Sequence, residues 1–567
     1  MNAQTITNPQ NPSAGTVSFI SLGGSEDVTR NMYLYEYKNQ ILIVDCGLGF
    51  PDESMLGVDL LLPDTTYLLE QLKAGKKIVG MLFTHGHEDH IGGLPFILPQ
   101  LIPQGAKEPK FPMYASPLTA ALANEKLSEF NMARSIKTVK FDDKPLKIGD
   151  FTVSFIRVTH SVPDSANIFI KTPVGNFFHG SDFKFDLSPA DGKRSDFARM
   201  VQAGEEGVLC LMSDCLGSDR SGFTPSEEKL GVNFEREMRE CKGKCIITTF
   251  SSNISRFNQA IAAAEKVNRK VVFVGRSMLK LKQIGDNLVY LKMKPGTDVQ
   301  LTELKKYKDN QLVFIVAGSQ GQEYSAMTRI GSGEHRDVKL VPDDVVIFSS
   351  DPIPGNEVPV QELVDMIVKR GAKVVHSTES EAFHVSGHGS TGDHMLLVAL
   401  TKPKFLLPNS GTYSNMVAYK EMGIKMGYAK KDIYLIENGQ EVVFGPETAT
   451  FGKRFEIKNV YVDKISGEEV DHYVVRDRER LGHEGIVIVM AEIKTSDGQL
   501  AEKPEFVVRG SSLVDTNQFA PALRAEIQRG LSGDKEKVIN WMHKRKMIGD
   551  ITARFLYKKY RTRPLVL

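Results

Sequence analysis

The chain has 567 residues, of which 41% are apolar and 25% are charged, and its 71 lysines and arginines nearly balance its 70 aspartates and glutamates. This length exceeds what one hydrophobic core serves, so about three domains are expected, and the composition is that of a soluble globular protein. The near-zero net charge excludes a global field that attracts nucleic acid, so such a partner would need a local basic groove.

Residues 1–17 are expected to form a disordered tail, because Asn, Gln, Thr and Pro dominate them and the charged start and apolar segment of a signal peptide are both missing. No apolar run approaches the ~18 residues that cross a bilayer, so no membrane partner is expected. The five cysteines are few and odd in number, which favours a reducing, cytoplasmic location. Cys241 and Cys245 are of the type that ligates zinc, but no second pair accompanies them, so inert thiols are the preferred interpretation.

Four candidate metal ligands follow the apolar segment 78–83, which predicts a buried strand. They are His85, His87, Asp89 and His90. A loop at a strand end lets a rigid sheet position side chains while water and substrate still reach them. Imidazole and carboxylate are ligands that zinc and manganese prefer. A histidine-rich surface loop is the alternative, but this spacing with glycines directly behind it favours a metal site.

Two later strand ends add candidate ligands. Residues 151–158 alternate apolar and polar side chains and lead to His160, while residues 175–179 lead to Asp182. A two-metal hydrolytic centre needs such additional ligands and a group that bridges the metals. Each residue alone has a simpler interpretation, His160 as a structural histidine and Asp182 as a turn or cap residue.

Two short loops of glycine and serine, at 318–321 and 386–390, follow apolar segments. Their N–H groups and hydroxyls can cradle a phosphate without much net charge. Alone they are weak signals, because glycine-rich turns are usually only turns.

A concentration of basic residues lies near the end of the chain. It contains Lys544, Arg545, Lys546, Arg554, Lys558, Lys559, Arg561 and Arg563. The solvated face of an amphipathic helix is the favoured interpretation, ahead of a phosphate-binding surface.

The order of the metal-ligand motifs resembles the metallo-β-lactamase superfamily, in which a His-x-His-x-Asp-His loop, a strand-end histidine and a Gly-Ser-Asp-Phe segment follow one another. The resemblance implies an α/β fold, an αββα sandwich of two mixed sheets flanked by helices. It also implies two zinc ions per chain, with Mn²⁺ or Mg²⁺ as alternatives. His85, His87 and His160 would hold one ion, Asp89 and His90 the other, and Asp182 would lie between them.

Segments beyond Asp182 are similar to the β-CASP domain of the nucleic-acid-processing branch, and their order closely resembles ribonuclease J. These segments lie at 211–214, 222–227, 249–253, 275–278, 318–322 and 352–357. The likeness runs from about residue 18 to about residue 445 and resumes at 474–478 and 485–489.

The domain organisation implied by this resemblance is discontinuous. It comprises the tail 1–17, a metallo-β-lactamase domain in two parts (18–215 and 355–450), the inserted β-CASP α/β domain 216–354, a linker 451–465 and a small C-terminal α/β domain 466–567. Helices are expected at 520–529 and 535–559 of this last domain. The family uses it for self-association, which implies a homodimer or homotetramer.

The resemblance further implies roles around a phosphodiester substrate. Asp89, Asp182, His388 and Asp214 would be catalytic. The metals would lower the pKa of a bound water held by the first two carboxylates, and Asp214 would orient His388 to protonate the leaving oxygen. The substrate phosphate would be bound by His384, Ser386, Gly387, His388 and Ser319. The activity implied is hydrolysis of single-stranded RNA in rRNA processing and mRNA decay, as a 5′-to-3′ exonuclease that prefers a 5′-monophosphate and as an endonuclease.

The chain departs from the family at the segment 408–412, where the family has Pro-x-His-Gly-Glu and its histidine completes the second metal site. Ser410 stands in the place of that histidine and Thr412 in the place of the glutamate. A serine hydroxyl is a poor ligand beside imidazole. Two hypotheses follow: an active nuclease with a weakened second metal site, or a weakly active or inactive paralogue that serves as an RNA-binding or partner subunit of an active ribonuclease J. The otherwise complete ligand set favours the first.

Overall fold

The computed structural model describes residues 15–52, 55–103, 106, 108–353, 355–376, 383–463, 469–511, 516–533 and 540–567. Most of the predicted tail therefore lies outside the described residues, and the first strand begins at Val17. The chain divides into two compact units, Met1–Gly49 with Leu62–Asn459, and Phe50–Leu61 with Val460–Leu567. Each is described by itself. Among the described residues, no helix combines the length and apolar character that a membrane crossing requires.

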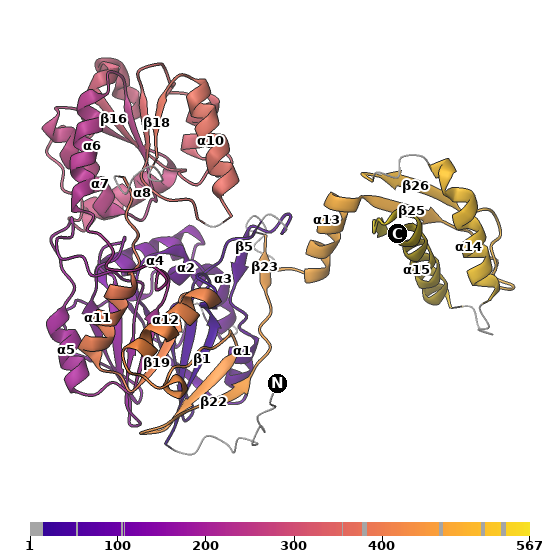
Figure 1. The fold of residues 1–567 in the computed structure, drawn as a ribbon, viewed down its shortest axis with the longest axis horizontal. Coiled ribbons are helices and arrows are strands. Elements are labelled where there is room, and N and C mark those ends of the chain that lie inside the picture. The colour runs from indigo at the N-terminus through magenta and orange to yellow at the C-terminus, as the bar shows by residue number, and fades with distance from the viewer. Residues whose placement is uncertain are drawn as a thin grey trace. The chain divides into compact units, whose positions relative to one another are not determined.

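Two mixed sheets pack face to face in the first unit (Figure 1). In spatial order, one sheet contains β22 (Ala449–Arg454), β21 (Gln440–Phe444), β1 (Val17–Gly23), β3 (Met32–Tyr37), β4 (Gln40–Val44), β6 (Lys77–Phe83), β7 (Met113–Ala115) and β8 (Ile136–Thr138). The other contains β19 (Phe405–Asn409), β13 (Cys210–Asp214), β12 (Asn176–His179), β11 (Ala166–Lys171), β10 (Phe151–Arg157) and β9 (Leu146–Ile148). A short bridge joins β2 (Ser25–Glu26) to β20 (Gly411–Thr412).

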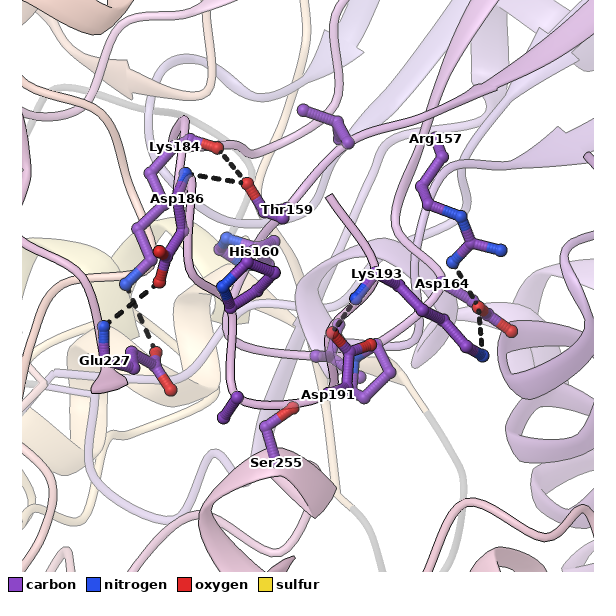
Figure 2. Close-up of a pocket in the computed structure, with 15 residues that line it drawn as sticks. Arg157, Thr159, His160, Asp164, Lys184, Asp186, Asp191, Lys193, Glu227 and Ser255 are labelled. Atoms are coloured by element: carbon purple, nitrogen blue, oxygen red, sulfur yellow. Dashed lines mark hydrogen bonds and ion pairs between the residues drawn. The ribbon is translucent and has the colours of Figure 1, made fainter. Parts of the chain in front are cut away.

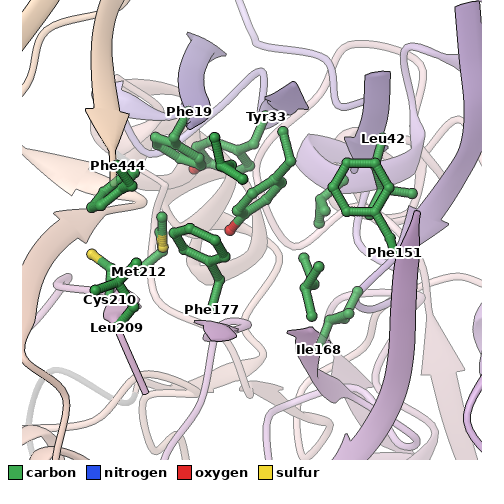
Figure 3. Close-up of a cluster of buried hydrophobic side chains, with 14 of the residues drawn as sticks. Phe19, Tyr33, Leu42, Phe151, Ile168, Phe177, Leu209, Cys210, Met212 and Phe444 are labelled. Carbon is green, nitrogen blue, oxygen red and sulfur yellow. The ribbon is translucent and has the colours of Figure 1, made fainter. Parts of the chain in front are cut away.

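Large side chains from both sheets fill the space between them. Phe19 and Tyr33 come from the first sheet, and Ile168, Phe177 and Met212 come from the second (Figure 3). Because successive side chains of a strand point to opposite faces, every second residue of these strands enters this core and the others face the helices. The strands are therefore apolar on both faces.

Helices cover both outer faces, which confirms the predicted αββα sandwich. The first sheet packs on α1 (Thr66–Lys73), α3 (Leu94–Leu101) and α4 (Pro117–Glu129). The second packs on α5 (Phe197–Glu205), α11 (Thr391–Thr401) and α12 (Tyr413–Lys425).

A five-stranded parallel sheet is inserted between β13 and β19. Its order is β15 (Lys270–Val274), β16 (Leu312–Val316), β14 (Cys245–Thr248), β17 (Val345–Phe348) and β18 (Lys373–Val375). One face packs on α6 (Glu228–Glu240), α7 (Ile254–Lys266) and α8 (Arg276–Asn287), and the other on α9 (Ala326–Ser332) and α10 (Glu357–Lys369).

The inserted domain extends beyond the predicted boundary at residue 354. Leu363 and Ile367 of α10 are buried against this sheet, and β18 pairs with β17. The segment 355–375 therefore belongs to the insert, and the chain returns to the sandwich with α11. The sequence pattern did not reveal this because an amphipathic helix fits either domain equally well.

The second unit contains two small sheets. One has the order β24 (Glu469–Val470), β23 (Val460–Val462) and β5 (Leu60–Leu62), and the other β26 (Glu505–Arg509), β25 (Ile486–Met490) and β27 (Leu565–Val566). Its helices are α13 (His472–Glu484), α14 (Ala520–Ser532) and α15 (Trp541–Tyr560).

The predicted linker 451–465 differs from the structure, because it holds the end of β22 and all of β23, whose backbone groups pair with neighbouring strands. The predicted helix 520–529 matches α14, which runs three residues further. The predicted start of the last helix at Lys535 lies outside the described residues, and α15 covers the rest of that prediction.

Candidate metal centre

The predicted ligands come from loops at one edge of the sandwich. His85 and His87 follow β6, and Asp89 and His90 lie on the short helix α2 (Glu88–Ile91). His160 follows β10 and Asp182 follows β12. Because β6 belongs to one sheet and β10 and β12 to the other, the packing of the two sheets brings these loops together.

The first ligand group contains His85, His87, His160 and Asp182, whose ligand atoms all lie within 4.8 Å of one another. His87 Nδ1 lies 3.1 Å from His85 Nε2 and 3.1 Å from His160 Nε2. His160 Nδ1 donates to the carbonyl of Gly387 at 2.8 Å. Its Nε2 therefore carries a lone pair, which faces the other ligands of the first group. Three imidazoles and a carboxylate converging in this way are a donor set that suits zinc.

Two observations support the fit of a metal ion. Asp182 is 3% exposed, and its buried Oδ1 atom has no hydrogen-bond partner among the described residues. Burial lowers the pKa of His85 and His160, and that of His87 to about 3. These imidazoles are therefore neutral at physiological pH, which is the form that binds metal ions.

The second group contains Asp89, His90 and Asp182. His90 Nε2 lies 3.4 Å from Asp182 Oδ2 and 3.6 Å from Asp89 Oδ2. On its other side, His90 Nδ1 lies 2.8 Å from Asp45 Oδ2. Asp45 also accepts hydrogen bonds from the backbone N–H and the hydroxyl of Thr84, both at 2.8 Å. Asp45 therefore fixes the ring of His90 and the start of the ligand loop.

The charge state of this second group differs from that of the first. Burial acts to lower the pKa of His90, but Asp182, Asp89 and Asp45 outweigh it and raise the pKa overall. Burial raises the pKa of Asp89 to about 6, against the opposing effect of His90. This group is richer in oxygen and poorer in nitrogen than the first.

Ser410 belongs to a small hydrogen-bonded cluster beside His90. Its hydroxyl lies 3.1 Å from Asn31 Oδ1 and 3.2 Å from the hydroxyl of Tyr33, which itself donates to Asn31 Oδ1 at 2.7 Å. Asn31 Nδ2 lies 3.1 Å from His90 Nε2 and donates to the carbonyl of Asp89 at 3.1 Å. The Asn31 amide therefore lies against the ring nitrogen of His90 that a second metal would need.

The third group contains Asp182, Asp214 and His388. His388 Nδ1 lies 2.9 Å from Asp214 Oδ2, and His388 Nε2 lies 3.9 Å from Asp182 Oδ2. Burial alone would lower the pKa of His388, but Asp214 and Asp182 raise it to about 9. His388 is thus a charged proton donor directed at the metal cluster.

The loop that carries His388 is held by Asp393, which is fully buried at the first turn of α11. Its carboxylate accepts three backbone N–H groups, those of Phe185 at 2.8 Å, Thr224 at 2.9 Å and Ser390 at 2.9 Å. One side chain therefore ties together the loops after β12, β13 and the Gly/Ser segment.

The predicted phosphate-binding residues fall into two groups. Ser386 Oγ accepts from the N–H of His388 at 3.1 Å and from Arg220 at 3.3 Å, beside the metal cluster. A Cβ atom on Gly387 would lie 2.7 Å from the ring of His160, so only glycine fits there. His384 instead lies 3.5 Å from Asp351 in the inserted domain. Ser319 follows β16 and, among the described residues, contacts none of the metal-cluster side chains.

A cavity of about 20 Å³, roughly one water molecule in size, lies behind His160 (Figure 2). Lys184 and Glu227 form an ion pair of 3.3 Å on one of its walls, and Asp186 accepts the N–H of Glu227 at 3.0 Å. Both ionic side chains are buried. These contacts join the loop after β12 to the inserted domain and hold the wall on which His160 sits.

The sequence reasoning did not identify Asn31, Asp45, Arg220, Lys184 or Asp393 as parts of this site. Asp45 directly follows the apolar strand β4 and has φ +63°, so a polar residue after a strand was its only local signal. The other four residues have no local sequence signal, because the contacts that place them in the site are with residues far along the chain.

Three parts of the chain match known protein families. Residues 26–178 match the metallo-beta-lactamase superfamily, residues 242–367 match the ribonuclease J beta-CASP domain, and residues 473–567 match the ribonuclease J C-terminal domain. A crystal structure of a protein of unknown function from Enterococcus faecalis V583 is similar with a TM-score of 0.52 at 15% identity, over 76% of this chain and 100% of that chain. That likeness shows the fold alone. The chain thus has the architecture of a metal-dependent hydrolase of the metallo-β-lactamase fold.

Similar proteins of known function identify the family within this class of hydrolases. The chain is 35% identical to ribonuclease J of Helicobacter pylori (strain ATCC 700392 / 26695), over 98% of this chain and 79% of the relative. It is 38% identical to ribonuclease J of Thermus thermophilus, over 84% and 82%, and 31% identical to ribonuclease J2 of Bacillus subtilis, over 97% and 98%. The chain belongs to the ribonuclease J family and is a hydrolytic nuclease, as the sequence resemblance predicted.

Proposed function

We propose that this chain is a metal-dependent ribonuclease that hydrolyses phosphodiester bonds of single-stranded RNA in rRNA processing and mRNA decay. The observation that carries the proposal is the convergence of His85, His87, His160 and Asp182 directly beside the His388–Asp214 pair. Both 5′-to-3′ exonuclease action, favoured by a 5′-monophosphate, and endonuclease action follow from membership of the family.

The metal of the first group is proposed to be zinc, because three neutral imidazoles and one carboxylate form its donor set. A metal bound there supplies Lewis-acid charge that polarises the phosphoryl group and the attacking water. The second group offers one imidazole and two carboxylates, so we expect it to bind more weakly and to accept Mn²⁺ or Mg²⁺.

The remaining catalytic steps are assigned to protein side chains. Asp89 and Asp182 hold the attacking water, and His388 gives its Nε2 proton to the leaving oxygen. Asp214 orients that imidazole through its 2.9 Å contact with Nδ1. Ser386 and the backbone at Gly387 face the scissile phosphate, whereas His384 and Ser319 lie on the inserted domain and are proposed to hold the terminal phosphate.

The second hypothesis, an inactive RNA-binding or partner subunit, is not favoured. Such a subunit has no need of three converging imidazoles, nor of a histidine held by Asp214. The effect of Ser410 is confined to the second ligand group. Assembly as a homodimer or homotetramer, pairing with a paralogous ribonuclease J, and a cytoplasmic location remain proposals. The last is supported by five free, buried cysteines.

Metal analysis combined with an RNA cleavage assay tests the function. Purified protein is assayed for bound metal by mass spectrometry, and for cleavage of 5′-monophosphate RNA with and without added manganese. His87→Ala and Asp89→Ala should abolish cleavage, whereas His483→Ala, an exposed histidine of α13, should leave it unchanged. Cleavage that survives His87→Ala and Asp89→Ala in a clean preparation would exclude the metal mechanism.

A further inference from the structure

A groove of about 600 Å³ lies in the second unit, and none of the candidate metal ligands among the described residues lines it. Its walls are α13, strands β25 and β27, and α15, the last helix of the chain (the C-terminal part of Figure 1). Val489, Ile493, Ile548 and Val566 give it an apolar floor. It is open enough for an extended chain to lie in it.

The rim of this groove is basic. Arg480, Arg545 and Lys546 line it, and Asp550 is the one acidic residue among the residues that form it. Within the part of the chain that the structure describes, neither a hydrogen bond nor an ion pair involves the side chains of these three cations. Other cations of the same region have partners: Arg554 donates to the carbonyl of Asp550, and Lys559 lies over the ring of Phe555.

Trp541, in the first turn of α15, is one of the residues that line the groove. It is 51% exposed, its neighbour Met542 is 82% exposed, and it is the single tryptophan of the chain. A large exposed aromatic beside unpaired cations is the combination that binds single-stranded nucleic acid, because bases stack on the ring and phosphates pair with the cations.

We propose that this groove binds a single-stranded segment of RNA, as a site separate from the metal centre, with a base stacked on Trp541 and phosphates on Arg480, Arg545 and Lys546. The choice of RNA rests on the proposed function. A second copy of this chain fits less well, because α15 carries six basic residues and one acidic residue, so two such surfaces repel each other.

The groove also accounts for part of the basic concentration near the end of the chain. Arg545 and Lys546 face the groove, whereas Lys558 and Lys559 are exposed elsewhere on α15. The basic cluster is therefore two surfaces. On the second, Arg561 and Arg563 already lie over the exposed ring of Tyr557, whereas Arg545 and Lys546 share the groove with the exposed Trp541.

Fluorescence of Trp541 in the full-length protein tests the proposal directly. The probe is a 5′-hydroxyl oligouridine of about 20 nucleotides, longer than the site size of a typical single-strand module, added in EDTA so that no cleavage occurs. We expect saturable quenching that weakens as salt is added. Absence of quenching at saturating RNA would overturn the proposal.

Charge-matched variants locate the contact. Arg545→Glu with Lys546→Glu should weaken binding by about tenfold or more and reduce the slope of log K against log salt by about 1.4, whereas Lys558→Glu with Lys559→Glu should change both far less. The neutral pair Arg545→Gln with Lys546→Gln, expected to weaken binding in the same direction, guards against misfolding of the charge-reversed variant. Equal losses in the groove pair and the control pair would overturn the groove as the site, as would a Trp541 signal that changes with protein concentration in the absence of RNA.

This experiment separates the two proposals. Quenching without any cleavage in metal would leave the groove standing and reject the proposed activity. Cleavage in metal without quenching would support the proposed activity and reject the groove as an RNA-binding site.

Discussion

Ser410 stands where the family has a histidine, so the second ligand group offers one imidazole fewer. Ser410 is 4% exposed, and its hydroxyl takes part in the cluster with Tyr33 and Asn31. That cluster holds the Asn31 amide against Nε2 of His90. A second metal must therefore displace a hydrogen bond and also do without an imidazole ligand, and both effects weaken its binding.

Replacing Ser410 by histidine should restore the second site. For Ser410→His we expect the tightly bound metal to rise from one to two ions per chain and the metal-dependent cleavage rate to rise with it, because an imidazole replaces a hydroxyl as ligand. Mass spectrometry of the native protein counts the ions independently of activity.

The matched control is Ser414→His, which adds the same side chain at an exposed position of α12. If Ser410→His binds no more metal than the unmodified protein, residue 410 does not limit the second site.

At the scale of elements, the site depends on how loops from different strands are fastened together. The ligand loops after β6, β10 and β12 are positioned by the two sheets, but the proton donor His388 lies on a segment between β18 and α11. Asp393 connects that segment to the loops after β12 and β13 through three backbone N–H groups. It is fully buried, so each lost contact would leave a backbone donor without a partner.

Asp393→Asn should therefore lower both stability and activity. The amide cannot accept at all three donors, so we expect a loss of about 2–4 kcal/mol in the free energy of unfolding, measured by urea denaturation. The cleavage rate should fall more than metal binding at the first group, because Asp393 supports His388 directly, whereas His85, His87 and His160 lie on loops to which, among the described residues, it makes no hydrogen bond.

Asp365→Asn provides the comparison, since Asp365 is exposed on α10 and pairs only with Gln361 in the same helix. Unchanged stability and cleavage in Asp393→Asn would contradict the anchoring role.

The whole molecule consists of two compact units. Every candidate metal ligand lies in the first unit, whereas the single tryptophan, Trp541, lies in the second. A ligand that binds only the folded form stabilises the unit that holds its site, by about 4 kcal/mol at a thousandfold excess over its Kd.

Removal of metal should therefore lower the thermal stability of the first unit more than that of the second. With EDTA we expect the thermal transition followed by circular dichroism, which reports mostly on the larger first unit, to fall by several degrees. The transition followed by Trp541 fluorescence should stay within about one degree, because metal binding is not linked to unfolding of the second unit. A Trp541 transition that moves together with the circular dichroism transition would show that the units unfold as one.

The sequence was sufficient for features whose signal is local. The spacing of His85, His87, Asp89 and His90 behind an apolar strand predicted the metal loop, because both parts lie within one short segment. Alternation of side chains predicted the strands before His160 and Asp182 in the same way. The extent of the inserted domain was missed, since the amphipathic helix α10 carries no sign of which sheet it covers.

The sequence by itself thus determined the fold class and the family, and it named candidate ligand residues that the structure brings together, because residue type and short-range spacing encode them. Only the tertiary structure decided how those residues act. The contact between Ser410 and Asn31 spans 379 positions, and that between His160 and Gly387 spans 227. Such pairs form because two packed sheets bring distant loops to one edge, and no local pattern records which loops will meet there.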